Sequence, residues 1–305
     1  MNIPAYLNPG DTVVLIAPAR SVTAQDICAF QNWTTAQGWQ LELSPNLFHV
    51  QDQFAGDDAL RAKDLAWALS HPTAKAIFTA RGGYGAMRTL EALEQRHNNV
   101  DQWLSQQTPK WFVGFSDMTT LHLLLNKNQW ASIHGPVATQ WGQTHSWVKE
   151  NGQQLSDTLC GKSTLLAVNA NQIANPCPFS GELIGGNLSL IFAALGTPNQ
   201  PDTTGKVLLI EDLDEYLYHL DRMVRSCKYA GIFDHVKALL VGSMIDMKDN
   251  AVPFGKTARE IISEALSDRN FPILFDVEIG HDHRNHSVKL GADITFDLLT
   301  LSQQP

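Results

Sequence analysis

The sequence predicts an α/β protein, in which a parallel sheet with helices on both faces is followed by a second, β-rich α+β domain. Two observations predict this arrangement. Short apolar runs alternate with helix-period segments through the first half of the chain, whereas the second half combines strong strands with fewer helices. The length of 305 residues also exceeds that of a typical single domain, so two domains are a sensible expectation.

The elements of the first half follow one another as strand and helix. The run Thr12–Ala17 (TVVLIA) is continuously apolar, as is typical of a strand covered on both faces. Apolar residues then recur at helical spacing, beginning with Ile27, Phe30 and Trp33. The same patterns predict strands at 39–43, 76–79 and 111–115, and helices at 62–69, 87–93 and 120–125. Such alternation is typical of a Rossmann- or flavodoxin-like sheet, whose sites lie at the carboxyl ends of the strands.

The pattern changes near the middle of the chain. Gln, Asn, Ser and Thr accumulate between about residues 140 and 180, as in a connecting segment. We therefore expect an N-terminal α/β domain at 1–145, a linker or crossover at 146–178 and a C-terminal β-rich domain at 179–305. Within the last of these, the sequence predicts strands at 207–210 and 239–241, a helix at 258–266 and an alternating β-ribbon at 288–302.

The composition argues against several classes of partner. A formal net charge of −9 does not suit nucleic acid or anionic membrane as the main partner, because both need a cationic surface. No apolar run approaches the roughly 20 residues that span a bilayer, and the N-terminus lacks the pattern of a signal peptide. The four cysteines show no CxxC spacing, which favours reduced, mostly structural thiols. We therefore expect a cytoplasmic protein.

A strand followed at once by a helix makes the segment 110–126 (KWFVGFSDMTTLHLLLN) the most informative one. This layout places Ser116 on a sharp turn beside the free backbone N–H groups of the helix start, which suit a developing oxyanion. The alternative is that Ser116 or Asp117 simply caps the helix. The surrounding residues are also not GxSxG, so the nucleophile elbow of α/β-hydrolases is not matched.

A glycine-rich turn, Ala80–Gly85 (ARGGYG), follows another predicted strand. Three glycines in four positions permit positive φ and a close approach of the backbone to a ligand. The spacing fits neither GxGxxG nor the P-loop, and no cofactor is expected. A plain tight turn is the alternative.

Acidic and imidazole side chains gather at two places in the second half. Glu211 and Asp212 directly follow the strand predicted at 207–210, where a carboxylate is well placed to orient a histidine. A solvated loop is the alternative. The segment 279–291 (IGHDHRNHSVKLG) contains three histidines, His281, His283 and His286. They complete no HExxH or other recognisable zinc spacing, so we expect one of them to act as a general base and expect no metal site.

In their order along the chain, these segments resemble the LD-carboxypeptidase family, which also contains the microcin C immunity peptidases. The resemblance covers most of the chain. It runs through GDTVVLIAPA, AGDDALRAKDLAWAL, FTARGGYGAMRTL, FVGFSDMTTLHLLL, the HGP at 134–136, GELIGGNLSLI, LLIEDLDEYLYHLDRM and the final GHDHRN and KLGA. Each motif alone is unspecific, but eight in the right order make the assignment specific.

The resemblance implies a two-domain serine peptidase with a Ser–Glu–His triad in that chain order, at Ser116, Glu211 and His281. His281 would take the Ser116 proton, Glu211 would hold the imidazole, and Ser116 would attack the peptide carbonyl to give an acyl-enzyme. The backbone N–H groups of Asp117 and Gly83 would form the oxyanion hole. Nucleophile and base would thus come from different domains.

The segment around the histidines departs from the family pattern, which tends to carry a Gly after the histidine and a Pro near KLG. Asp282 and Val288 stand at these positions here. His283 is therefore the alternative to His281. Glu215 is the alternative to Glu211, although a strand end fixes an acid better than the middle of a loop does.

The implied substrate is a peptidoglycan tetrapeptide, from which the terminal D-Ala is removed in cytoplasmic muropeptide recycling. Its free carboxylate and its zwitterionic diamino side chain need polar partners, for which the matching motifs supply Tyr84, Asn187 and Arg222. The alternatives for these residues are turn packing, a helix cap and a surface ion pair, respectively. The resemblance also implies a homodimer.

Three other functions remain open at this point. An immunity-type peptidase would cleave an amide in a peptide–nucleotide conjugate and would need aromatic side chains for a nucleobase, such as Tyr216 and Tyr218. A non-catalytic muropeptide- or nucleotide-binding protein would behave unchanged without the Ser116 hydroxyl. A metallopeptidase would lose its activity in chelator.

Overall fold

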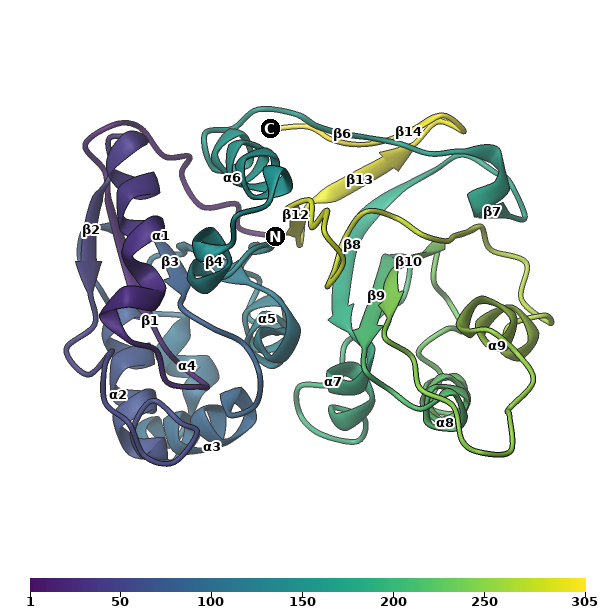
Figure 1. Cartoon of the computed structure of the whole chain (residues 1–305), viewed down its shortest axis with the longest axis horizontal. Helices are drawn as coiled ribbons and strands as arrows, with labels where there is room; N and C mark the ends of the chain where they lie inside the picture. Colours follow the sequence, from purple (N-terminus) through teal and green to yellow (C-terminus); the bar gives the residue numbers. More distant parts are fainter. The chain divides into compact units, whose positions relative to one another are not determined.

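A parallel sheet with helices on both faces organises the first of two units (Figure 1). The computed structural model describes residues 1–305, apart from the side chain of Ala170. Contacts divide the chain into a first unit of 1–162 with 287–291 and 305, and a second unit of 163–286 with 292–304. This division differs from the expected boundaries in two places. Much of the expected linker belongs to the first unit, and so does the short segment 287–291.

The sheet of the first unit has the strand order β12-β5-β4-β3-β1-β2. Its strands are β1 (Thr12–Ile16), β2 (Gln40–Leu43), β3 (Ala74–Thr79), β4 (Trp111–Gly114), β5 (Ser132–His134) and β12 (Val288–Leu290). The first five run parallel to their neighbours, and the order 2-1-3-4-5 is that of flavodoxin-like folds. The fold class predicted for the first half of the chain is confirmed.

Both faces of this sheet are covered because its strands are apolar on both sides. Along β1, Val13 and Leu15 pack into one core, and Val14 and Ile16 pack into another. The first core contains α1 (Ala24–Ala36) and α6 (Ser146–Leu159). The second contains α2 (Asp58–Leu69), α3 (Ala86–His97), α4 (Val100–Leu104) and α5 (Thr119–Lys127). With both faces buried, the ends of the strands remain as the place for a site.

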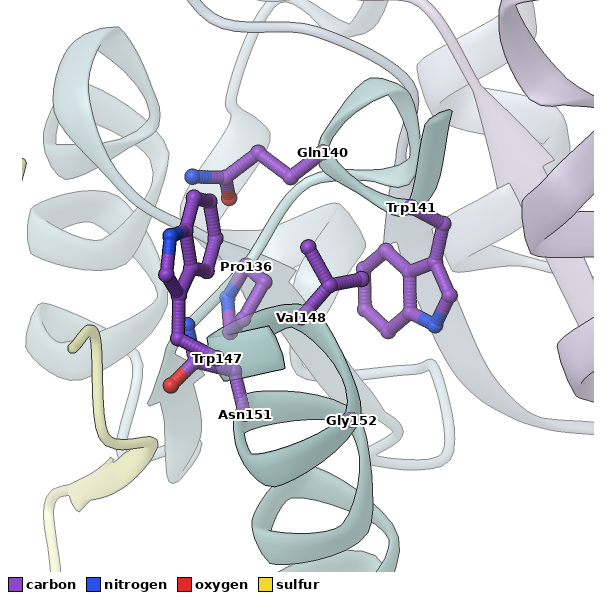
Figure 2. A pocket seen from close by; sticks show the side chains of 7 residues that line it. All are labelled: Pro136, Gln140, Trp141, Trp147, Val148, Asn151 and Gly152. Atoms are coloured by element: carbon purple, nitrogen blue, oxygen red, sulfur yellow. The ribbon is translucent and has the colours of Figure 1, made fainter. Parts of the chain in front are cut away.

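Helix α6 lies in the stretch that the sequence predicts as a linker. Four of its six buried residues are polar or glycine, so few apolar residues on the buried face mark this segment as a helix. Gly152 lets it approach two indole rings, since a Cβ there would lie 3.2 Å from Trp33 Nε1 and 3.4 Å from Trp141 Nε1. Figure 2 shows the pocket beside this contact, with Trp141 and Trp147 at opposite ends. Its volume of about 10 Å³ leaves room for about one water molecule.

A mixed sheet of eight strands organises the second unit, in the order β6-β14-β13-β8-β9-β10-β11-β7. Its parallel strands are β8 (Phe179–Asn187), β9 (Val207–Leu213), β10 (Ala238–Ile245) and β11 (Ile273–Leu274). The antiparallel strands are β6 (Thr164–Ala167), β7 (Ile173–Ala174), β13 (Asp293–Phe296) and β14 (Thr300–Gln303). Helices α7 (Leu188–Ala193), α8 (Leu217–Tyr229) and α9 (Ala258–Ala265) share one apolar core with this sheet. The predicted β-rich α+β domain is confirmed. The elements that the sequence did not predict in this unit are β6, β7, β8, β11, α7 and α8.

Short 3-10 helices complete the secondary structure. They are η1 (Ser116–Met118), η2 (Ala138–Gly142) and η3 (Ala170–Gln172). Among the helices that the structure describes, none combines the length and the apolar character that crossing a membrane requires. All four cysteines are free thiols, and only Cys227 is buried. This agrees with the expectation of reduced thiols and no disulfide framework.

The ribbon predicted at 288–302 is divided between the two sheets. β13 and β14 pair antiparallel, as expected of a ribbon. Val288–Leu290 instead forms β12, which pairs antiparallel with β5 in the first sheet. The prediction of one continuous ribbon is wrong, because alternation along a strand does not specify the neighbour with which the strand pairs.

Gly185 in β8 lies where no side chain fits. Its φ is +119°, and a Cβ would lie 2.0 Å from the carbonyl oxygen of Leu209 on β9. We predict that Gly185→Ala lowers the free energy of unfolding by roughly 3 kcal/mol or more, because steric overlap adds to backbone strain. Chemical denaturation checks this value.

The matched control is Gly196→Ala. Gly196 has a φ of +73°, but a Cβ there meets nothing within 4 Å, so only the backbone strain applies. Equal losses of stability in the two variants would contradict the role of the Leu209 contact.

Candidate active site

Ser116 begins a tight turn directly after strand β4. Its backbone φ is +63°, in the left-handed region that residues other than glycine seldom occupy. The turn continues as η1 and then as helix α5 from Thr119. The half-buried Ser116 therefore lies at the carboxyl ends of the parallel strands. Its strained backbone is of a kind that is common at functional sites.

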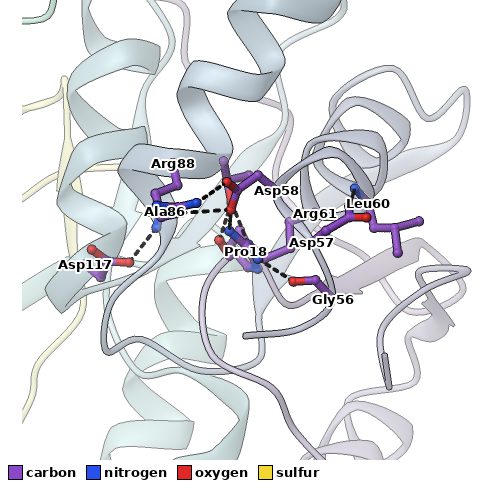
Figure 3. A network of polar contacts seen from close by, with 10 residues as sticks. Pro18, Gly56, Asp57, Asp58, Leu60, Arg61, Ala86, Arg88 and Asp117 are labelled. Atoms are coloured by element: carbon purple, nitrogen blue, oxygen red, sulfur yellow. Dashed lines mark hydrogen bonds and ion pairs between the residues drawn. The ribbon is translucent and has the colours of Figure 1, made fainter. Parts of the chain in front are cut away.

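Asp117 ties the Ser116 turn to the glycine-rich turn. Its buried side chain accepts, at Oδ2, a hydrogen bond of 2.7 Å from the N–H of Ala86, the first residue of α3 (Figure 3). Gly85 precedes this helix and has no side chain to cap it, so Asp117 satisfies the helix start instead. Burial raises the pKa of Asp117 to about 6, although the hydrogen bond from Ala86 and the charge of Arg61 lower it.

Two glycines of the glycine-rich turn lie against other side chains. A Cβ on Gly82 would lie 3.2 Å from the Cβ of Ser116, and a Cβ on Gly83 would lie 2.5 Å from the Cδ of Arg20. The absence of side chains therefore lets this turn approach both residues closely. The structure brings Gly82 and Asp117 together with Ser116, and it places Gly83 against Arg20.

Tyr84 follows these glycines as a partly exposed side chain. It is 48% exposed, and its ring centroid lies 6.1 Å from that of Phe54. The Tyr84 ring thus packs on Phe54 within the turn and is also accessible to solvent.

Glu211 and His281 form a buried pair in the second unit. Glu211 is the fifth residue of β9 and is fully buried beside Asn187, its register partner at the end of β8. His281 Nδ1 lies 2.6 Å from Glu211 Oε2. The backbone N–H of His281 also donates a hydrogen bond of 2.7 Å to Ser243 Oγ, which holds the residue from its main chain. In such a pair the carboxylate orients the imidazole and stabilises its protonated form, as the acid of a Ser–His–acid triad does.

The charge of Glu211 changes the acidity of this imidazole. Burial lowers the pKa of His281, but the nearby Glu211 carboxylate and its hydrogen bond raise it, and the net result is a pKa above the ordinary 6.5. The side chain of His281 is 10% exposed and that of Glu211 is not exposed at all, so solvent screens their interaction little.

The alternative residues have other partners. Glu215 Oε2 lies 2.6 Å from Nδ1 of His219, one turn further along the chain. His286 Nε2 lies 3.3 Å from Glu278. His283 is exposed, and its backbone N–H donates to Asp282. In contrast to these contacts, the one between His281 and Glu211 joins two residues of the triad that the resemblance implies.

Asp212 is a further buried carboxylate, which the sequence analysis names only together with Glu211 as a strand-end acid. It accepts hydrogen bonds of 2.9 Å from Asn187 Nδ2 and from the N–H of Ser189 in helix α7. Burial and the charge of Glu211 raise its pKa to about 7. Its position directly after a strand-end acid is the only sequence signal for it, and that signal does not distinguish a buried residue from a solvated one.

Asn187 and Arg222, the other predicted substrate-binding residues, have structural partners. Asn187 caps α7, because its side chain accepts from the N–H of Leu190. Arg222 is exposed on α8, with its guanidinium carbon 5.3 Å from the ring centroid of Tyr218. Within the part of the chain that the structure describes, no group of three or more His, Cys, Asp or Glu side chains is placed to hold a metal ion.

The effect of Glu211 on His281 can be tested without a substrate. We predict that Glu211→Gln moves the pKa of His281 to below its ordinary value, because burial is then no longer offset by the Glu211 charge. NMR titration of the ring Cε1–H measures this pKa. Glu215→Gln is the matched control and leaves the titration of His281 unchanged. An unchanged pKa in Glu211→Gln would contradict the electrostatic role of this carboxylate.

Both halves of the chain match one protein family. Residues 13–135 match the LD-carboxypeptidase N-terminal domain, and residues 180–296 match the LD-carboxypeptidase C-terminal domain. A Bacillus subtilis relative with the name "Probable murein peptide carboxypeptidase" is 31% identical over 297 residues, which cover 95% of this chain and 89% of the relative. The "Murein tetrapeptide carboxypeptidase" of Pseudomonas aeruginosa is 26% identical over 286 residues, which cover 92% of this chain and 91% of the relative.

Solved structures share the fold. The muramoyltetrapeptide carboxypeptidase from Oxalobacter formigenes has a TM-score of 0.82 at 24% identity, covering 96% of this chain and 99% of that chain. MccF in complex with glutamyl sulfamoyl guanosine has a TM-score of 0.84 at 18% identity, covering 99% of this chain and 98% of that chain. At such identities the likeness concerns the fold alone. The two family matches and the Bacillus relative, however, span most of the sequence. The chain therefore belongs to the LD-carboxypeptidase family, and the predicted class of enzyme, a serine-type carboxypeptidase, is confirmed.

Proposed function

We propose that this chain removes the terminal D-Ala from peptidoglycan-derived tetrapeptides, using Ser116, His281 and Glu211 as a catalytic triad. The observation that carries the proposal is the buried hydrogen bond between His281 and Glu211, 2.6 Å long, which leaves an imidazole oriented for proton transfer. Ser116, on its strained turn, is the nucleophile of this proposal. The names of the Bacillus and Pseudomonas relatives, which both mention murein peptides, support the class of substrate.

The proposed reaction proceeds through an acyl-enzyme. His281 accepts the proton of Ser116 as its Oγ attacks the carbonyl before the terminal D-Ala, and the N–H groups of Asp117 and Gly83 donate to the resulting oxyanion. His281 then gives the proton to the leaving amine, which departs as free D-Ala. A water molecule, deprotonated by His281, hydrolyses the ester and restores the Ser116 hydroxyl.

The setting of this activity is part of the proposal. Cytoplasmic recycling of muropeptides would supply the tetrapeptide, and a homodimer would be the working form. Tyr84 and Arg222 are the proposed contacts for the polar groups of the substrate, since both are exposed at the surface of their own unit. Asn187, which caps α7, is proposed as a further contact for the substrate at the start of this helix.

A second candidate is the immunity-type cleavage of a peptide–nucleotide amide. Tyr216 and Tyr218 favour it, since both rings are exposed by about two fifths, at 39% and 41%, and their centroids lie 5.6 Å apart. Rings of this kind can stack on a nucleobase. Parallel assays of a muramyl tetrapeptide and an acyl-sulfamoyl adenylate distinguish the two activities, and predominant turnover of the adenylate would overturn our proposal.

The nucleophile can be tested by removing one oxygen atom. We predict that Ser116→Ala lowers kcat for release of D-Ala from the tetrapeptide by about 10³-fold or more, because no acyl-enzyme can form. Mass spectrometry of the released amino acid measures the rate. Ser70→Ala is the control, since Ser70 follows α2 and lies before the amino end of β3, at the opposite edge of the sheet. A variant at Ser116 that keeps its activity would favour a non-catalytic role for this turn.

The pH dependence follows from the raised pKa of His281. An imidazolium cannot accept the Ser116 proton, so kcat/KM rises with pH through an apparent pKa above 6.5. We predict that Glu211→Gln shifts this rise to lower pH and lowers the plateau by roughly 10²- to 10⁴-fold, since the imidazole loses its orienting partner. Initial rates across the pH range provide the measurement. A rise that stays at the same pH in the variant would contradict the assignment of His281 as the base.

A further inference from the structure

Arg20 is a cation beside the candidate nucleophile, and no sequence motif assigns it a role. It follows β1 in an exposed position, and its side chain lies across Gly83, where a Cβ would be 2.5 Å from its Cδ and 2.6 Å from its Nε. The neighbouring Gly82 in turn lies against Ser116. A continuous set of contacts within the first unit therefore leads from the guanidinium of Arg20 through the glycine-rich turn to the Ser116 side chain.

Buried polar contacts anchor the loop that carries Arg20. The carbonyl of Pro18 accepts a hydrogen bond of 2.8 Å from Thr89 Oγ1, which itself accepts one of 2.9 Å from the buried Arg61. Figure 3 shows Pro18 and Arg61 in this network. The carbonyl of Ala19 accepts from the N–H of Ala55, and Arg20 forms an antiparallel bridge with Phe54. The backbone of Arg20 is thus held in place before a ligand binds, so that binding does not need to order this loop.

The other arginines near this turn already have acidic neighbours. Arg61 and Arg88 both form ion pairs with Asp58. Arg81 acts electrostatically on Asp26. Among the residues that the structure describes, no carboxylate forms an ion pair with Arg20. The charge of Arg20 lowers the pKa of Asp117, but the Asp117 carboxylate is buried and already accepts a hydrogen bond from the N–H of Ala86.

The position of Arg20 is also where this fold class binds ligands. In a sheet of order 2-1-3-4-5 the strand order reverses between β1 and β3, and ligands bind outside the carboxyl ends of these two strands. Arg20 lies in the loop after β1, and Gly83 lies in the turn after β3. The contact between Arg20 and Gly83 therefore joins the two loops that flank this switch point.

We propose that Arg20 binds the free terminal carboxylate of the substrate and so restricts cleavage to the last residue of the peptide. The inference rests on the proposed function. In a carboxypeptidase substrate, the terminal carboxylate is separated from the attacked carbonyl only by the leaving amino acid. It must therefore lie close to the nucleophile, where a guanidinium can hold both oxygens of a carboxylate with two parallel hydrogen bonds.

The test compares a tetrapeptide that ends in free D-Ala with the same peptide ending in D-Ala amide. The variant Arg20→Gln keeps the packing of the side-chain stem on Gly83 but removes the charge. We expect it to lower kcat/KM for the acid by roughly 10- to 100-fold, while kcat/KM for the amide stays nearly constant. The preference for the acid over the amide then collapses. Arg81→Gln, at the neighbouring exposed arginine, keeps the preference of the unmodified protein.

Equal losses for acid and amide in Arg20→Gln would overturn the inference, because they would reflect a disturbed turn and not a lost carboxylate contact. Binding to Ser116→Ala, measured by calorimetry with the same two peptides, separates this outcome from failure of the proposed function. Preferential binding of the acid that disappears in the Ser116→Ala, Arg20→Gln double variant supports the inference even if the unmodified protein hydrolyses neither peptide. Equal binding of acid and amide by Ser116→Ala overturns it.

Discussion

The hydrogen bond from the Ala86 N–H to the buried Asp117 carboxylate is the contact on which the first unit's candidate site depends. It joins the turn after β4, which carries Ser116, to the turn after β3, which carries the glycines. Burial of an acid is costly unless hydrogen bonds compensate, and the pKa of about 6 reflects that cost. The hydrogen bond fixes the positions of the two loop ends relative to each other, beside the candidate nucleophile.

The second unit repeats this arrangement around Glu211. Asp212 follows the candidate catalytic acid as Asp117 follows the candidate nucleophile, and it accepts the N–H of Ser189 at the start of α7. In both units the helix that is capped follows the neighbouring parallel strand, β3 or β8. Orientation of His281 by Glu211 thus depends on a strand end that is itself fixed by a helix start. The same solution to one packing problem occurs in two sheets of different topology.

The sequence predicts the parts of this molecule that local patterns encode. The flavodoxin-like sheet follows from apolar runs such as 12–17, and the pairing of Glu211 with a histidine follows from a strand-end acid and family motifs. Helix α6 could not be predicted, because its buried face is largely polar and packs on indole rings through Gly152. Other features depend on residues that are distant in the chain. These features are the pairing of β12 with β5, the contact of Arg20 with Gly83 and the burial of Asp212 against Asn187. The hydrophobic periodicity of a single segment does not predict such long-range contacts.

Strand β12 places a demand on the synthesis of this protein. At the edge of the first sheet, β5 pairs with residues 288–290, which leave the ribosome after almost the whole chain. Until then, the nascent sheet presents unpaired N–H and C=O groups along β5, which can pair with strands of other chains. The open edge persists while residues 163–286 are translated. Rapid elongation or chaperone cover during that interval would protect the emerging polypeptide from aggregation.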